Sequence, residues 1–432
     1  MPISPARAAA FDILLRVERE NAYASELLHA EQYAYLSSPD HGLATELVMG
    51  TLRWRSVLDE KIAARSSQKI EKLDLEVLIA LRLAVYQLQF LDRVPQHAAV
   101  HESVELVKQG RRQSAAPFVN AVLRKLSGGE KPLIAENAAQ TAHPPWLVTR
   151  WQQEFGPDAA KAICEYDQQP PQTSIRLHAP GLQEELKKEG AGLAPGHLLT
   201  SARRVVSGDI TKTAAFRDGR LFIQDEASQL VPLLLGGGQR ILDCCAAPGG
   251  KTRILAELNP SSPVVAVELH PNRARLMKKL VTAKNVQIVT GDITGLRIEE
   301  KFDRVLADVP CSGTGTLARN PEIKWKLKPD DLKDLQSRQT AILQAAMRQV
   351  ASGGRLVYST CSLEREENVD VVERALAADP SFQLLDCGAE LERLHDDLAW
   401  KGATPLTSGP YLRTIPGLHP CDGFFAALLE KR

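Results

Sequence analysis

Residues 240–252, RILDCCAAPGGKT, decide the fold of the second half of this sequence. Arg240–Cys244 is a short apolar run typical of a strand, and Gly249–Glu257 has the composition of a helix. The loop between them is built of small residues, which let a backbone approach a ligand, and it leads to the free N–H groups of a helix start. Its Gly250-Lys251-Thr252 ending is that of a phosphate-binding loop, but Cys245 stands where that motif needs its first glycine, and no G-x-G-x-x-G occurs. An ordinary tight turn remains the alternative.

Strand-like and helix-like segments alternate from this stretch onward. The expected strands are 264–268, 286–290, 302–308 and 355–359, and the expected helices are 273–283 and 332–351. Strands separated by helix-length connections predict a mostly parallel, doubly wound α/β sheet with helices on both faces. Ligands of such sheets bind at the carboxyl ends of the strands.

Acidic residues stand at the ends of two of these strands. Glu268 ends the strand VVAVE, where a carboxylate can accept hydrogen bonds from both ribose hydroxyls of a nucleoside. Asp292 follows the next strand, where it could reach an adenine amino group, although alone it is equally typical of a helix N-cap. With the small-residue loop and no pyrophosphate motif, the set predicts an adenosyl ligand, S-adenosylmethionine.

Two cysteines follow the last two parallel strands. Asp308-Val309-Pro310-Cys311 closes one strand, and Thr360-Cys361 closes the next. A lone cysteine in such a fold is usually a buried small hydrophobe, but these two lie past their strands, at the ligand-binding edge. Thiols and a carboxylate beside a methyl donor indicate chemistry on a pyrimidine. Cytosine C5 is too weak a nucleophile to take a methyl group directly, and a thiolate that adds at C6 turns the ring into an enamine-like nucleophile. A carboxyl group at N3 would stabilise the developing charge, and a base must then remove the C5 proton.

The rest of the chain predicts two further domains. Residues 1–130 are expected to be all helical, with an apolar helix around Leu78–Phe90 as the buried centre of a bundle. Residues 131–145 have the composition of a linker. Residues 146–220 are expected to form a small α+β module and residues 221–432 the methyltransferase domain. A length of 432 residues fits about three domains.

The charge balance, the cysteines and the apolar runs of the sequence exclude several classes of protein. Lys+Arg and Asp+Glu are both 53, which excludes a uniformly basic nucleic-acid coat but not a local basic groove. The seven cysteines form no CxxC and no Cys/His quartet, so we expect no disulfide scaffold and no metal site. We find no signal-like start and no run of about 18 apolar residues, so we expect a cytoplasmic protein without a membrane segment.

The motifs resemble one enzyme family. DVPCSGTG, YSTCSLEREEN and DCCAAPGGKT are similar to the catalytic and cofactor motifs of the RNA (cytosine-5)-methyltransferases. LATELVMGTLRWRSVLD, YQLQFLDRVPQHAAVHESVELVK and FVNAVLRKL resemble an antitermination-factor-type helical RNA-binding domain. The order of the motifs, and the closing DGFFAALLEKR, resemble bacterial members that modify a cytosine of 16S ribosomal RNA.

The resemblance implies a role for individual residues. Cys361 would be the nucleophile that bonds to C6, Cys311 would assist proton removal and release, and Asp308 would contact the base. The cofactor-binding residues that it implies are Cys245, Ala246, Ala247, Pro248, Gly249, Gly250, Lys251, Glu268, Asp292 and Asp308. The implied substrate is the cytosine at position 967 of 16S rRNA, free or in an early small-subunit assembly intermediate, modified by a monomer.

Three other functions compete with this interpretation. A DNA cytosine-5 methyltransferase would use the cysteine of Pro310-Cys311, but too few residues follow Cys361 for a target-recognition region. A non-catalytic RNA-binding assembly factor would need only the helical domain. An exocyclic-amine methyltransferase would need an aromatic residue where Cys311 stands. The candidates for RNA contact are basic clusters, although such clusters more often form a solvated face: Arg111-Arg112, Arg203-Arg204, Lys278-Lys279 and the run Arg319, Lys324, Lys326 and Lys328. Trp325 within that run could stack on an unpaired base or equally pack under the loop.

Overall fold

The computed structural model describes residues 3–20, 22–127 and 137–432, which fold into two compact units. The first, here called the helical unit, comprises Met1–Pro170 together with Leu317–Lys326. The second, the sheet unit, comprises Pro171–Thr316 and Leu327–Arg432. Residues 146–170 and 317–326 thus cluster with the helices, although the sequence predicted them in later domains. Of the predicted linker, residues 131–136 lie outside the described residues, and α8 (Ala138–Thr141) begins within the remainder.

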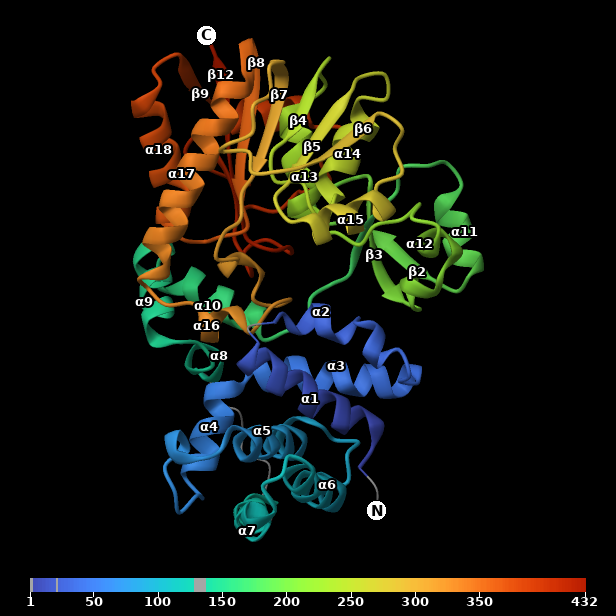
Figure 1. Cartoon of the computed structure of the whole chain (residues 1–432), viewed down its shortest axis with the longest axis vertical. Helices are drawn as coiled ribbons and strands as arrows, with labels where there is room; N and C mark the ends of the chain where they lie inside the picture. Colours follow the sequence, from blue (N-terminus) through green and yellow to red (C-terminus); the bar gives the residue numbers. More distant parts are fainter. Residues whose placement is uncertain (1–2, 21, 128–136) are drawn as a thin grey trace. The chain divides into compact units, whose positions relative to one another are not determined.

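The helical unit is built around one apolar helix (Figure 1). That helix, α5 (Leu75–Phe90), buries twelve of its sixteen residues, as predicted for a bundle centre. The main helices around it are α1 (Pro5–Arg19), α3 (Ser38–Arg53), α4 (Arg55–Ala63), α6 (Gln96–Gln109) and α7 (Ala116–Ser127). The unit also contains α2 (Ala24–Leu28), α9 (Pro145–Phe155), α10 (Pro157–Asp167) and α16 (Ile323–Lys326). Ser37 caps α3 by accepting a hydrogen bond from the Asp40 backbone N–H.

The segment Leu317–Lys326 is fixed in the helical unit by buried polar contacts. Lys324 Nζ donates to the Arg53 carbonyl at 3.0 Å and lies 3.4 Å from His143 Nε2. Trp325 Nε1 donates to the Leu52 carbonyl at 2.6 Å. Burial lowers the pKa of Lys324 to about 7, against the opposing charge of Asp167. Lys324 and Trp325 are therefore structural parts of this unit rather than RNA contacts.

This buried lysine should make the stability of the helical unit depend on pH. Between pH 7 and about 10 the unfolded chain keeps the Lys324 proton and the folded unit does not, so stability rises with pH, by up to about 1 kcal/mol per unit. Hydrogen exchange of amides in α3 and α10 at pH 7.5 and 9.5, corrected for intrinsic rates, measures this slope. Lys324→Met should remove the slope and Lys69→Met, at an exposed position, should keep it. An unchanged slope in Lys324→Met would contradict the assignment.

A small antiparallel sheet opens the sheet unit. Its strands β1 (Ser174–Arg176), β2 (Gly192–Pro195) and β3 (Ala202–Ser207) have the order β1-β3-β2. The helices α11 (Leu182–Lys188) and α12 (Ala214–Arg217) accompany it. Ile175, Leu182, Leu186 and Ile210 belong to its own small core. This is the α+β module that the sequence predicts.

The large sheet has nine strands in the order β10-β11-β12-β8-β7-β4-β5-β6, with β9 paired to β12. Its strands are β4 (Ile241–Asp243), β5 (Val264–Glu268), β6 (Val286–Thr290), β7 (Phe302–Asp308), β8 (Val350–Thr360), β9 (Phe382–Leu385), β10 (Thr407–Ser408), β11 (Tyr411–Thr414) and β12 (Phe424–Lys431). Strands β4 to β8 pair in parallel, and β12 is antiparallel to β8. The predicted doubly wound α/β domain is confirmed, with a Rossmann-like parallel part.

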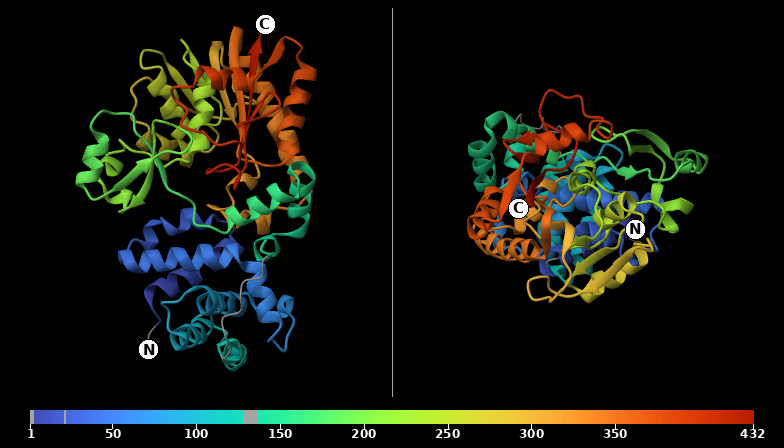
Figure 2. Two further views of the ribbon diagram at one scale, coloured as in Figure 1. Left: turned by 180° about the vertical axis from the view of Figure 1, so that it is seen from behind. Right: turned by 90° about the horizontal axis from the view of Figure 1, so that it is seen from above.

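Helices cover both faces of this sheet (Figures 1 and 2). They are α13 (Glu226–Leu235), α14 (Gly250–Leu258), α15 (Pro271–Leu280), α17 (Asp331–Gln349), α18 (Val369–Ala378) and α19 (Cys387–Arg393). Side chains of alternate strand residues enter different cores: Leu306 and Val357 pack in the core that includes α13, whereas Val305 and Leu356 pack with α17. This arrangement leaves the carboxyl ends of β4, β7 and β8 at one edge.

Candidate active site

The loop after β4 is shaped by its small residues and by one buried carboxyl group. Gly249, the N-cap of α14, has a φ of +108°, and a Cβ there would lie 2.5 Å from Val281 Cγ2, so only glycine fits. Asp243 Oδ2 accepts a hydrogen bond of 2.7 Å from the Thr252 hydroxyl. This bond fixes the end of β4 to the first turn of α14, with the loop held between them.

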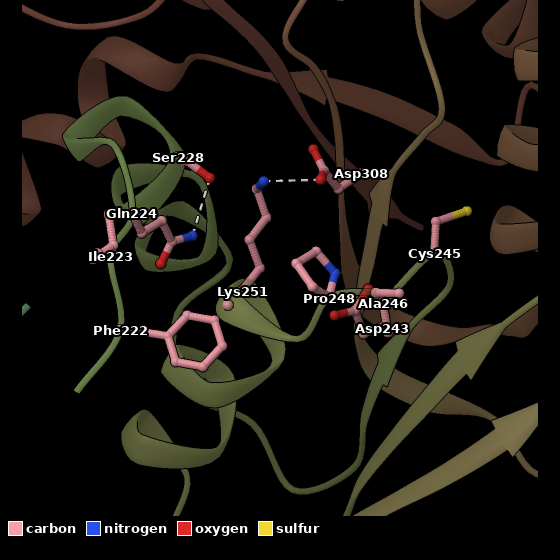
Figure 3. Close-up of a pocket in the computed structure, with 12 residues that line it drawn as sticks. Phe222, Ile223, Gln224, Ser228, Asp243, Cys245, Ala246, Pro248, Lys251 and Asp308 are labelled. Atoms are coloured by element: carbon pink, nitrogen blue, oxygen red, sulfur yellow. Dashed lines mark hydrogen bonds and ion pairs between the residues drawn. The ribbon is translucent and has the colours of Figure 1, made fainter. Parts of the chain in front are cut away.

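The loop forms one wall of a pocket (Figure 3). Seven predicted cofactor residues line it: Cys245, Ala246, Ala247, Pro248, Gly250, Lys251 and Asp308. Asp243 and four residues that the sequence analysis did not select complete the lining: Phe222, Ile223, Gln224 and Ser228. The four precede or begin α13, in a stretch without a recognisable motif. Gly249, Glu268 and Asp292 are not among the lining residues.

Two of the three predicted acidic residues of the cofactor site, Glu268 and Asp292, hold the backbone around them. Glu268 is buried and accepts hydrogen bonds from the backbone N–H groups of Ala247, at 3.3 Å, and His270, at 2.8 Å. Asp292 is exposed, and its Oδ1 accepts from the backbone and hydroxyl of Thr294. Glu268 thus ties the strand β5 to the cofactor loop, and Asp292 shapes the turn after β6.

The pocket has the features needed to hold S-adenosylmethionine. Asp243 Oδ1 is buried without a hydrogen-bond partner among the described residues, and burial raises the pKa of this carboxyl to about 7. A buried acceptor beside small loop residues suits a ligand that brings its own N–H or O–H donors. A Cβ added to Gly250 would lie 3.2 Å from the Gln224 side chain, so the loop has little room for a larger residue.

Lys251 and Asp308 form an ion pair in this pocket (Figure 3). Lys251 Nζ lies 2.8 Å from Asp308 Oδ2, and Asp308 Oδ1 accepts a 2.7 Å hydrogen bond from the Ser359 hydroxyl. Burial disfavours the ammonium, yet the pKa of Lys251 is raised, because the Asp308 carboxylate attracts the charge and so does the Cys361 sulfur. The pair therefore presents a fixed cation and a fixed carboxylate next to Cys361.

The two cysteines meet beyond the ends of adjacent strands. Asp308 of β7 is paired with Ser359 of β8, so the loops that carry Cys311 and Cys361 begin side by side. The two Sγ atoms are 3.4 Å apart. The hydrogen bond with Cys361 raises the pKa of the Cys311 thiol, as do its burial and the negative charges of Glu367 and Asp308. The two thiols therefore differ: Lys251 lies near Cys361, and carboxylates lie near Cys311.

Most of the basic clusters named from the sequence are engaged within the protein. Arg112 lies 3.3 Å from Glu76, and Arg203 donates to the Gln183 side chain. Lys326 Nζ donates to the Ala22 carbonyl. Lys278 and Lys279 at the end of α15 are exposed, so they remain candidates for phosphate contacts.

The described part of the chain contains neither a metal-binding cluster nor a membrane-spanning helix. No group of three or more metal-ligating side chains was found in residues 3–20, 22–127 and 137–432. Over the same residues, no helix is both long and apolar enough to cross a membrane.

The open sheet with a small-residue loop after β4, and a cofactor pocket at the strand ends, define an S-adenosylmethionine-dependent methyltransferase. Residues 231–430 match the family described as 16S rRNA methyltransferase RsmB/F. Residues 4–128 match the NusB family, and residues 143–200 match the ferredoxin-like domain of Methyltr_RsmF/B-like proteins.

Similar proteins span the whole chain. The Probable ribosomal RNA small subunit methyltransferase B of Bacillus subtilis (strain 168) is 33% identical over 99% of this chain and 98% of its own length. The chain therefore belongs to the RsmB/F family of rRNA methyltransferases. The crystal structure of PH0851 has the same fold, with a TM-score of 0.81, 24% identity and 100% coverage of both chains. NSun6 from Pyrococcus horikoshii, solved with SFG, covers 67% of this chain and 98% of its own, with a TM-score of 0.58 and 21% identity.

The short distance between the thiols predicts sensitivity to oxidation. A disulfide needs the Sγ atoms, now 3.4 Å apart, to approach to about 2.05 Å. With diamide as oxidant, each pair of thiols gives two electrons and two protons to the reagent and forms one S–S bond. We expect loss of methyl transfer that dithiothreitol restores, and peptide mapping should show a Cys311–Cys361 bridge. Cys311→Ser should form no internal bridge, and a wild-type protein that stays fully reduced would contradict the prediction.

Proposed function

We propose that this enzyme transfers a methyl group from S-adenosylmethionine to C5 of a cytidine in 16S rRNA, through a covalent bond between Cys361 Sγ and C6 of the base. Family resemblance suggests the cytosine at position 967. The observation that supports this chemistry most directly is the pair of thiols 3.4 Å apart, next to the Lys251–Asp308 ion pair. Cys361 lies near the Lys251 cation, whereas the negative charges of Glu367 and Asp308 act on Cys311.

Each residue has a distinct task in this proposal. The Cys361 thiolate adds to C6, and the electron pair of the C5–C6 bond becomes available at C5. Asp308, held by Lys251 and Ser359, is assigned the contact with the base, where its protonated form would donate a hydrogen bond to N3 and stabilise the negative charge that develops on the ring. S-adenosylmethionine, held in the pocket whose lining includes Cys245, Ala246 and Lys251, would supply the electrophilic methyl group to C5 and leave as S-adenosylhomocysteine.

Release needs a base at C5. When the C5 proton leaves, its electron pair re-forms the C5–C6 double bond, and the C6–S bond breaks to return the Cys361 thiolate. Cys311 lies next to Cys361, and its sulfur, after losing its own proton to solvent, can accept the proton from C5. We assign Cys311 this role.

The substrate must present an unpaired or flipped cytosine, because the thiol and the methyl donor need access to its faces. Free 16S rRNA or an early small-subunit assembly intermediate meets this requirement. We further propose that the enzyme acts as a monomer in the cytoplasm.

The test is methyl transfer from labelled S-adenosylmethionine to protein-free 16S rRNA, with DNA assayed in parallel and the product nucleoside identified. We expect 5-methylcytidine at one position of the RNA. Label in DNA alone, or a different methylated nucleoside, would overturn the proposal. If naked RNA is inert, the assay is repeated on partly assembled small subunits; label there identifies the assembly intermediate as substrate, and its absence counts against the reaction.

A further inference from the structure

Glu367 is a buried acidic residue that the mechanism above does not use. It ends the short helical turn η6 (Arg365–Glu367), six residues after Cys361, and its side chain has no exposed surface. A buried carboxylate is stable only when donors satisfy its oxygens. Glu367 therefore needs hydrogen-bond partners, and the identity of these partners indicates what the residue does.

Four hydrogen bonds converge on this carboxylate from three segments. Oε1 accepts from the Ser312 backbone N–H at 2.8 Å and from Gln339 Nε2 at 2.8 Å. Oε2 accepts from the hydroxyls of Ser312 and Ser362. Gln339, on α17, also donates to the Pro310 carbonyl at 3.0 Å.

The two serines that donate to Glu367 are the sequence neighbours of the two catalytic thiols. Ser312 directly follows Cys311, and Ser362 directly follows Cys361. Their hydroxyls also lie 3.1 Å from each other. One carboxylate thus holds the residue next to each thiol, on two loops that start from different strands.

We propose that Glu367 is a positioning residue that sets the spacing of the two catalytic thiols through Ser312 and Ser362. The proposal rests on the reaction proposed above. It assigns no contact between Glu367 and the substrate or the cofactor.

The negative charge of Glu367 also affects the pKa of the Cys311 thiol, which gives a measurable sign of its position. The groups around Cys311 are Tyr358 of β8, Cys361 directly after β8, Asp308 of β7 and Glu367 of η6. The Lys251 cation is paired with Asp308. After the hydrogen bond with Cys361 and burial, the negative charges of Cys361 and Glu367 raise the pKa of Cys311 further. Removal of the Glu367 charge should therefore lower the pKa of Cys311.

The first test needs no RNA. Alkylation of Cys311 by iodoacetamide is followed against pH in a Cys361→Ala background, with and without Glu367→Gln, which keeps the side-chain size. We expect the pH midpoint to fall by about one unit on loss of the charge. Glu373→Gln, at an exposed position of α18, should leave the midpoint unchanged. The readout does not depend on which nucleic acid is the substrate.

The second test measures catalysis. Single-turnover methyl transfer by Glu367→Gln should fall by about 10- to 100-fold, because misplacement by a fraction of an ångström has such effects. Binding of S-adenosylmethionine should stay within about twofold, since Glu367 does not line the pocket. Ser312→Ala and Ser362→Ala, which are milder changes, should each slow the reaction, and each should add little to Glu367→Gln in a double variant.

The results separate the two proposals. An unchanged alkylation midpoint together with an unchanged turnover rate in Glu367→Gln would overturn the role of Glu367. A lowered midpoint in a protein that methylates no cytosine would retain the influence of Glu367 on Cys311 and reject the proposed reaction. If Glu367→Gln fails to fold, full activity in both serine variants would count against the positioning role.

Discussion

Cys361→Ala is expected to abolish methyl transfer, by about 10⁴-fold or more, while S-adenosylmethionine still binds. Without the sulfur no bond to C6 forms, so C5 keeps the weak nucleophilicity of an unactivated cytosine. Cofactor binding should persist because Cys361 is absent from the lining of the pocket, which is formed by the loop after β4 and by residues preceding α13. Single-turnover transfer of labelled methyl groups and calorimetric binding of the cofactor measure the two quantities.

The matched control is Cys164→Ala, which removes a buried thiol from α10 in the helical unit. It should retain near wild-type turnover after correction for any loss of folded protein. Normal turnover in Cys361→Ala would refute its assignment as the nucleophile.

Cys311→Ala should instead accumulate enzyme covalently bound to RNA. Cys361 can still add to C6 in this variant, but the sulfur assigned to remove the C5 proton is gone, so the C6–S bond persists. Denaturing gels of enzyme mixed with substrate RNA and S-adenosylmethionine should show a band of lower mobility that ribonuclease removes.

The double variant Cys311→Ala/Cys361→Ala should give no such band, because it lacks the bonding sulfur. A shifted band in Cys361→Ala, and none in Cys311→Ala, would reverse the roles of the two cysteines. That outcome would also favour the thiol assignment expected of a DNA cytosine-5 methyltransferase.

Local sequence patterns predicted the strands of the catalytic domain well, because the limits of a strand depend on the residues within and next to it. The strands 264–268, 286–290 and 302–308 have the predicted limits, because short, largely apolar runs bounded by polar or small residues specify strands. The strand predicted at 355–359 is longer, Val350–Thr360. The proximity of Cys311 and Cys361 follows from parallel pairing of adjacent strands, although their roles stay a prediction.

Features that depend on distant partners were not predictable from the sequence. The stretch EREEN was recognised only as part of a motif, and nothing local indicates that Glu367 accepts hydrogen bonds from loops on two strands. Lys324 and Trp325 were candidates for RNA contact because an aromatic residue within a run of basic residues can stack on an unpaired base. Their burial depends on carbonyl groups of residues 52 and 53, more than 270 positions earlier in the sequence.

The segment Leu317–Lys326 belongs to the helical unit, although it lies far from residues 1–170 in the sequence. This limits where the protein can be cut into fragments that fold. A fragment that begins at residue 171 keeps this segment but loses the Leu52 and Arg53 carbonyls that receive hydrogen bonds from Trp325 and Lys324. A fragment that ends at residue 170 keeps the carbonyls and loses the segment. Chimaeras between family members should therefore exchange residues 1–170 and 317–326 together, as a single inherited module that is split in the sequence.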